Sequence, residues 1–377
     1  MAVATDVRRR REDLVLGVQR GAGPGDVFAE ASPRLLRLVP FDAAAWLATD
    51  PGTGLPTSPV RIDGLTGVTR AMCATHWQHE ILVDDVNLFR SLARRAVPAG
   101  TLRGSVEDPD DSPRYRRFLR PLGFADELRA VLRVGDAPWG SVTLWRREGA
   151  RPFSAAEAEI LGGLSAPIGE ALRRHARPDP FPMEAPDHHG PGLLLFDADG
   201  EVVSVNDEAQ AWLAELPPEP GVVTDHGVLP VWLLITTYRA AAIRHGAGDG
   251  TARTRARTRR GRWLVCHASC LRQPDGEVGN VALVIEPAQP AAIAPLVVEA
   301  YDLTRREQEI VRLIARGAAT GEIADQLFLS PHTVRDHVKA IFAKAEVSSR
   351  GELTAKLFAE FYEPLHAAEV TRRPHTG

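Results

Sequence analysis

A short stretch near the C-terminal end of this 377-residue chain constrains its fold most, because capping signals divide the stretch into separate helices. Thr304 and Glu307 form a capping box, and the apolar helical pattern that follows them stops at Gly317. A second, shorter helix is expected from Thr320 to about Phe328. The stretch therefore predicts a compact helical domain.

A third helix is expected to have two different faces. Ser330 is a favourable N-cap, and Pro331 follows at the first helical position, where its missing N–H costs nothing. The apolar residues recur at helical spacing and should face the core: Val334, Val338, Ile341, Phe342 and Ala345. The opposite face carries His332, Arg335, Asp336 and Lys339. A polar helix held over a shorter one fits the major groove of DNA.

Ser349 and Glu352 predict a fourth helix, with Leu353, Leu357 and Phe361 facing inward. The whole run resembles the LuxR-type DNA-binding domain over residues 300–363, through the motifs LTRRE, EIADQLFLSPHTV, HVKAIF and SSR. The resemblance implies an all-α four-helix domain in a sequence-specific transcription regulator that binds double-stranded DNA.

The resemblance also implies which residues of this chain would contact DNA. Base edges would be read by Arg335, Asp336 and Lys339. The residues along the phosphates would be Ser330, Thr333, His337 and Lys344, and His332 lies on the same face. An ordinary solvated helix face is the alternative interpretation of the three charged residues.

Two positions depart from the family pattern. Gly321 stands where many relatives carry a lysine, so a backbone contact can be missing. Ala345 and Glu346 replace the usual Leu-Gly pair, so the end of the third helix can differ. The acidic Asp336 favours a cytosine donor and repels phosphate, which predicts that it reads sequence.

Bulk composition gives no independent sign of nucleic-acid binding, because the net charge is -4. With 44% hydrophobic and 25% charged residues, the chain has the composition of soluble globular domains. The sequence has neither an apolar run of about 18 residues nor a signal-peptide pattern, so we expect a cytoplasmic protein. Three cysteines are too few for a disulfide framework.

Two proline-rich segments divide the chain into three blocks. We expect a sensor domain at 10–176, a linker at 177–191, a second domain at 192–287, a linker at 288–299, the DNA-binding domain at 300–363 and a flexible tail at 364–377.

The first block combines helices with an antiparallel hairpin. A turn at GDAP joins an alternating strand that ends near Val134 to a second strand at Trp139–Arg146. Ser154 and Glu157 then cap a long helix. The segment from GFADELRAVLRV to SAPIGEAL resembles a GAF domain, which implies a central antiparallel sheet flanked by helices.

The second block contains two further hairpins. An Asp-Gly turn at Asp199 and Gly200 joins the first pair of strands, and a turn at Pro274–Gly276 joins the last pair. One helix is expected between them at Trp232–His245. The block is similar to a PAS domain. The expected fold class is thus multidomain α+β, with GAF-like and PAS-like antiparallel-sheet sensor domains followed by the four-helix domain.

The densest basic run places four arginines on one face of an extended segment: Arg253, Arg255, Arg257 and Arg259. A solvated face that blocks edge pairing is the simplest interpretation. Contact with DNA phosphates and contact with an acidic surface of another domain are the alternatives.

Two other groups of residues do not indicate a metal site. His76, His79 and Glu80 lack the order of a zinc protease motif, so an amphipathic helix is the better interpretation. Cys266 and Cys270 are spaced for one face of a strand and are expected to be thiols rather than metal ligands. We expect no metal, no evident cofactor and no enzymatic activity, because the sequence contains no recognisable catalytic motif.

The sequence therefore predicts a homodimeric one-component sensor, whose GAF-like and PAS-like region binds a small ligand or a partner and controls the helix-turn-helix. In the alternative, these domains are dimerisation or partner-docking scaffolds without a small ligand.

Overall fold

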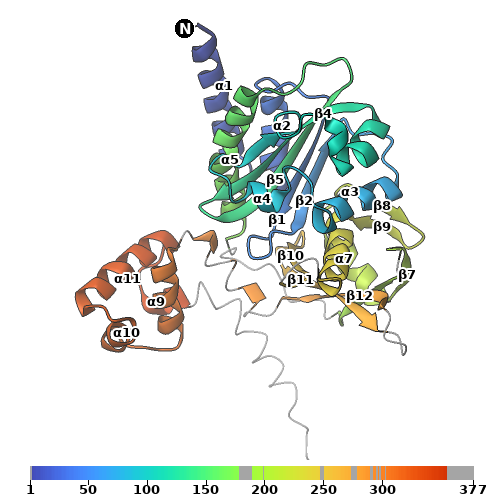
Figure 1. Ribbon diagram of the computed structural model, residues 1–377. Helices are drawn as coiled ribbons and strands as arrows, with labels where there is room; N and C mark the ends of the chain where they lie inside the picture. Colours follow the sequence, from blue (N-terminus) through green and yellow to red (C-terminus); the bar gives the residue numbers. More distant parts are fainter. Residues whose placement is uncertain are drawn as a thin grey trace, which may run out of the picture. The chain divides into compact units, whose positions relative to one another are not determined.

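The computed structural model describes residues 2–177, 189–197, 199–246, 250–272, 278–288, 292–293, 296, 299–301 and 303–354 (Figure 1). The chain forms two compact units. One contains residues 1–175 and 186–287, and the other contains residues 176–185 and 288–377. The first holds two five-stranded antiparallel sheets and a two-stranded one, and the described secondary structure of the second is helical, so the expected multidomain α+β class is confirmed.

The first part of the larger unit, here called the GAF-like lobe, spans α1 to α5. Its helices are α1 (Ala2–Gln19), α2 (Pro24–Leu36), α3 (Arg70–Leu82), α4 (Phe89–Leu92), η1 (Pro109–Asp111), η2 (Tyr115–Leu119), η3 (Arg120–Leu122) and α5 (Ala155–His175). Its strands are β1 (Ala43–Thr49), β2 (Pro56–Asp63), β3 (Ala99–Thr101), β4 (Phe124–Val134) and β5 (Ala137–Arg147), which form an antiparallel sheet in the order β2-β1-β5-β4-β3.

Helices cover both faces of this sheet. The long helix α5 packs on β4 and β5, with α1 and α2 beside it. It approaches so closely at Gly140 that a Cβ there would lie 2.8 Å from Leu172 Cδ1. The helix begins at the expected capping box, in which Ser154 N–H donates to Glu157 over 2.8 Å. Arg129 of β4 points the other way, towards α3 and α4.

The second part of the larger unit is here called the PAS-like lobe. Its elements are β6 (Gly192–Phe196), β7 (Val202–Val205), α6 (Asp207–Glu215), β8 (Gly221–Thr224), β9 (Gly227–Pro230), α7 (Val231–Arg244), β10 (Arg253–Arg257), β11 (Trp263–Arg272) and β12 (Val278–Pro287). Its five-stranded sheet has the order β10-β11-β12-β6-β7. When the strands of each five-stranded sheet are numbered along the chain, both sheets have the order 2-1-5-4-3. The expected turn at Pro274–Gly276 lies outside the described residues, and the β8–β9 hairpin was not expected.

The two lobes share a hydrophobic core cluster, and a separate cluster lies within the GAF-like lobe. Helix α7 packs on β11 and β12 of its own sheet and also on α3 and β2 of the GAF-like lobe. Trp232 of α7 is fully buried, and Val60 and Trp77 of the GAF-like lobe belong to the same core cluster. Because α7 has protein on both sides, the lobes form a single body.

Polar contacts close the seam between the lobes. Asp50, just after β1, accepts a hydrogen bond of 2.7 Å from Arg255 Nε, and both side chains are buried. Thr57 donates from its hydroxyl to the Arg255 carbonyl over 2.6 Å. From the other lobe, the Glu219 carboxylate accepts from the backbone N–H of Val60 over 3.0 Å and from the Trp232 indole.

These contacts correct the expectation of a solvated arginine face. Arg255 is only 2% exposed and contacts an acidic residue of another domain. Arg253 and Arg257 are half-buried, and Arg257 donates to the His175 carbonyl. Arg259, which follows β10, is exposed as expected and donates to the Ala214 carbonyl. The physical reason is that β10 lies against β2, so the strand edge expected to face water is covered by protein.

The smaller unit contains α9 (Arg305–Ala315), α10 (Thr320–Leu327) and α11 (Pro331–Ala345). All three expected helices are confirmed, including the Thr304–Glu307 capping box and the Ser330 cap. Residues 350–354 are helical, while the rest of the expected fourth helix, the tail and most of both linkers lie outside the described residues. In the described part of the chain, no helix is both long and apolar enough to cross a membrane.

Candidate nucleic-acid interface

Helix α11 presents the polar face that the sequence predicts. Val334, Ile341 and Ala345 are fully buried beneath it. The Ser330 hydroxyl accepts from Thr333 N–H over 3.1 Å, which fixes the first turn. On the outer side, His332, Arg335, Asp336 and Lys339 are exposed, while Thr333 and His337 are half-buried. The structure thus brings the predicted base-reading residues together on one solvent-facing surface, here called the α11 face.

Contacts within this face already orient two of its side chains. His332 Nδ1 lies 3.0 Å from Asp336 Oδ2, one helical turn along. Arg335 Nε donates to the Pro331 carbonyl over 3.2 Å. The carboxylate of Asp336 therefore has a neighbouring imidazole as well as solvent, and this neighbour can hold it towards the same side of the helix.

The far end of α11 is anchored to the start of α9. Lys344 Nζ lies 2.7 Å from Glu307 Oε2, and Thr304 N–H donates to the same carboxylate over 2.7 Å. Burial by itself would raise the pKa of Glu307, but the hydrogen bonds from Lys344 and Thr304 outweigh it and hold that pKa below its usual value. Lys344, expected along the phosphates, thus also ties α11 to the rest of the domain.

Both α10 and α11 end at a residue with a left-handed backbone conformation. Phe328, the C-cap of α10, has φ 54°, and Glu346, the C-cap of α11, has φ 53°. Helices commonly end in this way with glycine. Although Ala345 and Glu346 depart from the family's Leu-Gly pair, α11 therefore still ends in the left-handed geometry that is common at the C-terminal end of a helix.

A second candidate site is the charged interior of the GAF-like lobe. Arg114 donates to Glu127 from Nε at 3.0 Å and from Nη2 at 2.8 Å. Arg129 donates from Nη2 to Glu80 over 2.7 Å. Both guanidinium groups are fully buried between β4 and the helices α3, α4 and η2. Trp145 Nε1 also donates to Glu127 over 3.1 Å, so these ions lie in a polar network.

Two buried imidazoles adjoin this network. His79 is 4% exposed, and neither of its ring nitrogens has a hydrogen-bond partner among the described residues. His76 packs on Phe118 with ring centroids 4.4 Å apart, and its Nδ1 is also unpaired within the described chain. Burial, together with the positive charges of Arg129 and Arg114, holds the pKa of His76 well below 6.5. The sequence pattern singled out His76, His79 and Glu80 but not their buried arginine neighbours, because these come from distant segments.

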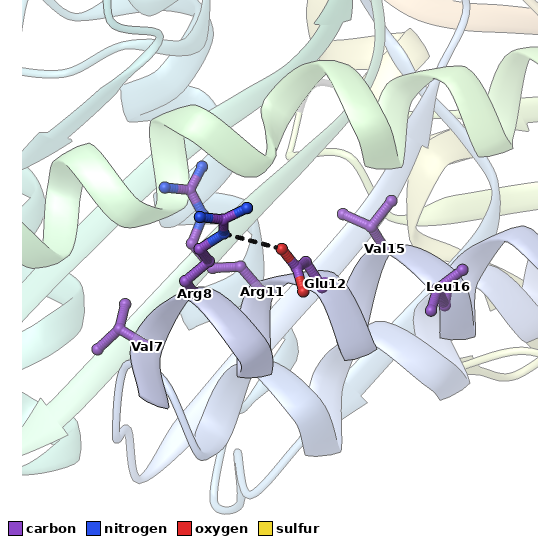
Figure 2. A pocket seen from close by; sticks show the side chains of 6 residues that line it. All are labelled: Val7, Arg8, Arg11, Glu12, Val15 and Leu16. Atoms are coloured by element: carbon purple, nitrogen blue, oxygen red, sulfur yellow. Dashed lines mark hydrogen bonds and ion pairs between the residues drawn. The ribbon is translucent and has the colours of Figure 1, made fainter. Parts of the chain in front are cut away.

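A groove also lies along α1 of the larger unit. Figure 2 shows its lining residues, which are Val7, Arg8, Arg11, Glu12, Val15 and Leu16. Arg8 and Glu12 form an exposed ion pair of 3.1 Å across one helical turn. Because the described lining comes from a single helix, the groove is an open helix face rather than an enclosed ligand site.

The remaining sequence candidates have structural roles. The Asp197 carboxylate accepts from Asp199 N–H over 3.0 Å and from Glu201 N–H over 2.8 Å, which closes the expected hairpin turn. Cys266 is fully buried in β11, and Cys270 is half-buried in the same strand. Burial raises the pKa of Cys266 far above its ordinary value, which keeps the thiol protonated.

Comparison with known proteins places the helical domain in a family. The family described as bacterial regulatory proteins, luxR family, matches residues 302–357. The uncharacterized transcriptional regulatory protein YhcZ of Bacillus subtilis is 47% identical over 62 residues, which cover 16% of this chain and 28% of that protein. The chain thus spans about a quarter of YhcZ.

Two further proteins extend the comparison. The crystal structure of Escherichia coli SdiA covers 92% of this chain and 94% of its own at 14% identity, with a TM-score of 0.34, too low to indicate a shared overall fold. The spore germination protein GerE of Bacillus subtilis is 38% identical over 55 residues, which cover 15% of this chain and 74% of GerE. Together with the family match at the helix-turn-helix, this shows that the chain belongs to the luxR family of bacterial regulatory proteins.

Proposed function

We propose that this chain is a transcription regulator that binds specific duplex DNA through the α11 face. The observation that carries the proposal is the division of α11 into a fully buried apolar side and an exposed polar side. The buried side fixes the helix on α9 and α10, so the polar side chains are presented on a rigid support. Arg335, Asp336 and Lys339 are proposed to read base edges.

The remaining residues of the face are proposed to position the domain on the sugar-phosphate backbone. They are Ser330, His332, Thr333, His337 and Lys344. The Lys344 ammonium has three N–H donors, so it can keep its bond to Glu307 and still meet a phosphate. The net charge of -4 predicts modest nonspecific affinity, because that affinity grows with the number of neutralised phosphates.

The test is DNA affinity on a duplex that the full chain enriches from a randomised pool. Arg335→Ala and Lys339→Ala should each cost about 1–3 kcal/mol on that duplex. Arg312→Ala is the matched control, because it removes an exposed arginine from α9 and should change affinity little. Unchanged binding in both α11 variants would exclude the α11 face as the recognition surface.

Asp336 offers a test of sequence reading. Asp336→Ala should weaken discrimination between the enriched duplex and a scrambled one, while affinity for the scrambled duplex stays the same or rises. The reason is that a carboxylate accepts from cytosine but repels phosphate. Equal loss of affinity on both duplexes would argue that Asp336 has only a structural role.

We further propose that the chain is a one-component sensor with a small ligand in the GAF-like lobe. Support comes from His79, whose two buried ring nitrogens lack partners within the described chain, beside the buried ions Arg114 and Arg129. Unpaired buried polar atoms are costly, so a bound molecule that pairs them would stabilise the lobe. Native mass spectrometry of protein from its own host should show retained mass that is lost from His79→Leu.

A homodimer is proposed because one recognition helix covers a small interface and paired half-sites gain from linkage. Sedimentation at micromolar concentration should show a dimer, at least with DNA. A monomer under both conditions would contradict this part of the proposal. The alternative function, a docking scaffold without a small ligand, is favoured if native mass spectrometry finds only the bare chain.

A further inference from the structure

Phe328 combines a left-handed backbone with an exposed aromatic ring. Its backbone has φ 54° and ψ 43°, a left-handed conformation that residues other than glycine and asparagine rarely adopt. The residue is also 96% exposed, although a phenylalanine is normally buried. Glycine would relieve the backbone, and the exposed ring adds no burial in the folded domain, so folding alone does not account for an aromatic residue here.

Hydrogen bonds hold this turn in a single conformation. Leu329 N–H donates to the Ala324 carbonyl over 2.9 Å, and Phe328 N–H donates to the Asp325 carbonyl over 3.4 Å. Arg306 of α9 donates to the Leu327 carbonyl. The left-handed backbone is therefore imposed by the end of α10, and the ring is carried outward on a fixed support.

The turn that carries Phe328 leads directly into α11. Ser330, the cap of α11, is two residues further on, and the exposed α11 face begins at His332. The exposed ring thus belongs to the turn that immediately precedes the α11 face. A duplex that meets the first turn of α11 also offers apolar surface at the groove wall, through deoxyribose carbons and thymine methyl groups.

We propose that Phe328 is a further DNA-contacting residue, whose ring packs on this apolar surface beside the bases that α11 faces. This inference rests on the proposed function. The ring would then lose its contact with water only in the complex, which turns its exposure into binding free energy. Duplex DNA is the chosen occupant because Phe328 lies two residues before the Ser330 cap of α11.

The test compares Phe328→Gly, Phe328→Ala and Phe328→Tyr in the full chain, on the enriched duplex. Glycine and alanine both remove the ring and should weaken binding about tenfold, while tyrosine should keep most of the affinity. Glycine also relieves the left-handed backbone, so amide hydrogen exchange in α10 and α11 should slow about fivefold relative to the alanine variant. Val223→Ala, which trims a 76% exposed valine in β8, should leave DNA affinity unchanged.

The glycine variant separates a binding role from a structural one, because it should raise amide protection relative to alanine while it lowers DNA affinity. A glycine variant that is better protected but binds more weakly supports the proposal. Unchanged affinity in the glycine and alanine variants would overturn it, and so would a glycine variant that loses both protection and affinity. If the wild-type chain enriches no duplex, the proposed function itself fails and this inference with it.

Modified DNA distinguishes the two parts of the groove wall. Replacing thymines of the enriched duplex by uracil removes only the methyl groups. If the ring packs on a thymine methyl, this replacement weakens binding by the wild type but not by Phe328→Ala. If the ring packs on deoxyribose, both proteins keep their affinities, and the about tenfold difference between them remains.

Discussion

The buried ion pair between the lobes gives a prediction whose size follows from its surroundings. Asp50 is fully buried and Arg255 is 2% exposed at the side chain, so solvent cannot compensate either charge if its partner is removed. Breaking a buried pair in this way costs about 3–5 kcal/mol. Asp50 keeps backbone hydrogen bonds from Gly52, at 2.9 Å, and Arg255, at 3.2 Å, so Arg255→Met should fall near the lower end of that range.

The assay is urea denaturation of the full chain followed by tryptophan fluorescence. All 7 tryptophans precede residue 264, so the signal reports only the two lobes. Because the lobes share a core cluster, the wild type should unfold in a single transition, and Arg255→Met should move that whole transition. The double variant Asp50→Leu/Arg255→Met should lose much less than the sum of the single changes, since it leaves no unpaired buried charge.

The matched control is Arg120→Met, which breaks an exposed ion pair with Asp110 inside the GAF-like lobe. Its cost should be about 0–1 kcal/mol. If Arg255→Met costs no more than this control, the reasoning from burial is refuted. Two separate fluorescence transitions in the wild type would refute the shared core.

Three further predictions concern individual side chains. The pKa of His76 is lowered by burial and by Arg129 and Arg114, so the unfolded state takes up a proton at a higher pH than the folded state does. The free energy of unfolding should therefore fall by up to about 1.4 kcal/mol per pH unit below about 6.5. In urea titrations, His76→Phe should make this pH dependence flatter. The lowered pKa of Glu307 contributes stability that is present above a pH of about 4.5 and is lost as the pH falls through the folded-state pKa. Glu307→Gln should therefore speed hydrogen exchange in α9 and α11 at neutral pH, while in acid the variant and the wild type should exchange at the same rate. Ser330→Ala removes the cap of α11 and should cost about 1 kcal/mol, seen as faster exchange of its first-turn amides, whereas unchanged exchange would contradict the capping role.

The helical domain could be predicted from sequence because its signals are local. The Thr304–Glu307 box and the Ser330 cap each involve residues only three apart, so a linear pattern contains the whole interaction. The division of α11 into two faces follows from helical spacing alone. The residues proposed to contact DNA remain a prediction, since their roles depend on a duplex rather than on the fold.

The seam between the lobes could not be predicted in the same way. Asp50 and Arg255 are 205 residues apart, and the alternating pattern of β10 is equally consistent with water or protein on its arginine side. The β8–β9 hairpin was missed because each strand has only 4 residues, too few for a clear alternation. In the GAF-like lobe, Glu80 meets Arg129 across 49 residues, so a pattern around His76 and His79 could show an amphipathic helix but not the charged interior.

The shared core limits how a signal in one lobe can act. Helix α7 contacts its own sheet on one side and α3 with β2 on the other, while Glu219 holds both Trp232 of α7 and the backbone of Val60 in β2. A ligand that shifts α3, the helix bearing His76 and His79, must therefore disturb the packing of α7 or move with it. Hydrogen exchange should then change in α7 when the GAF-like lobe is loaded, although no residue of α7 belongs to the charged cluster. Protection confined to α3 and α4 would show that the core between the lobes absorbs the change instead of transmitting it.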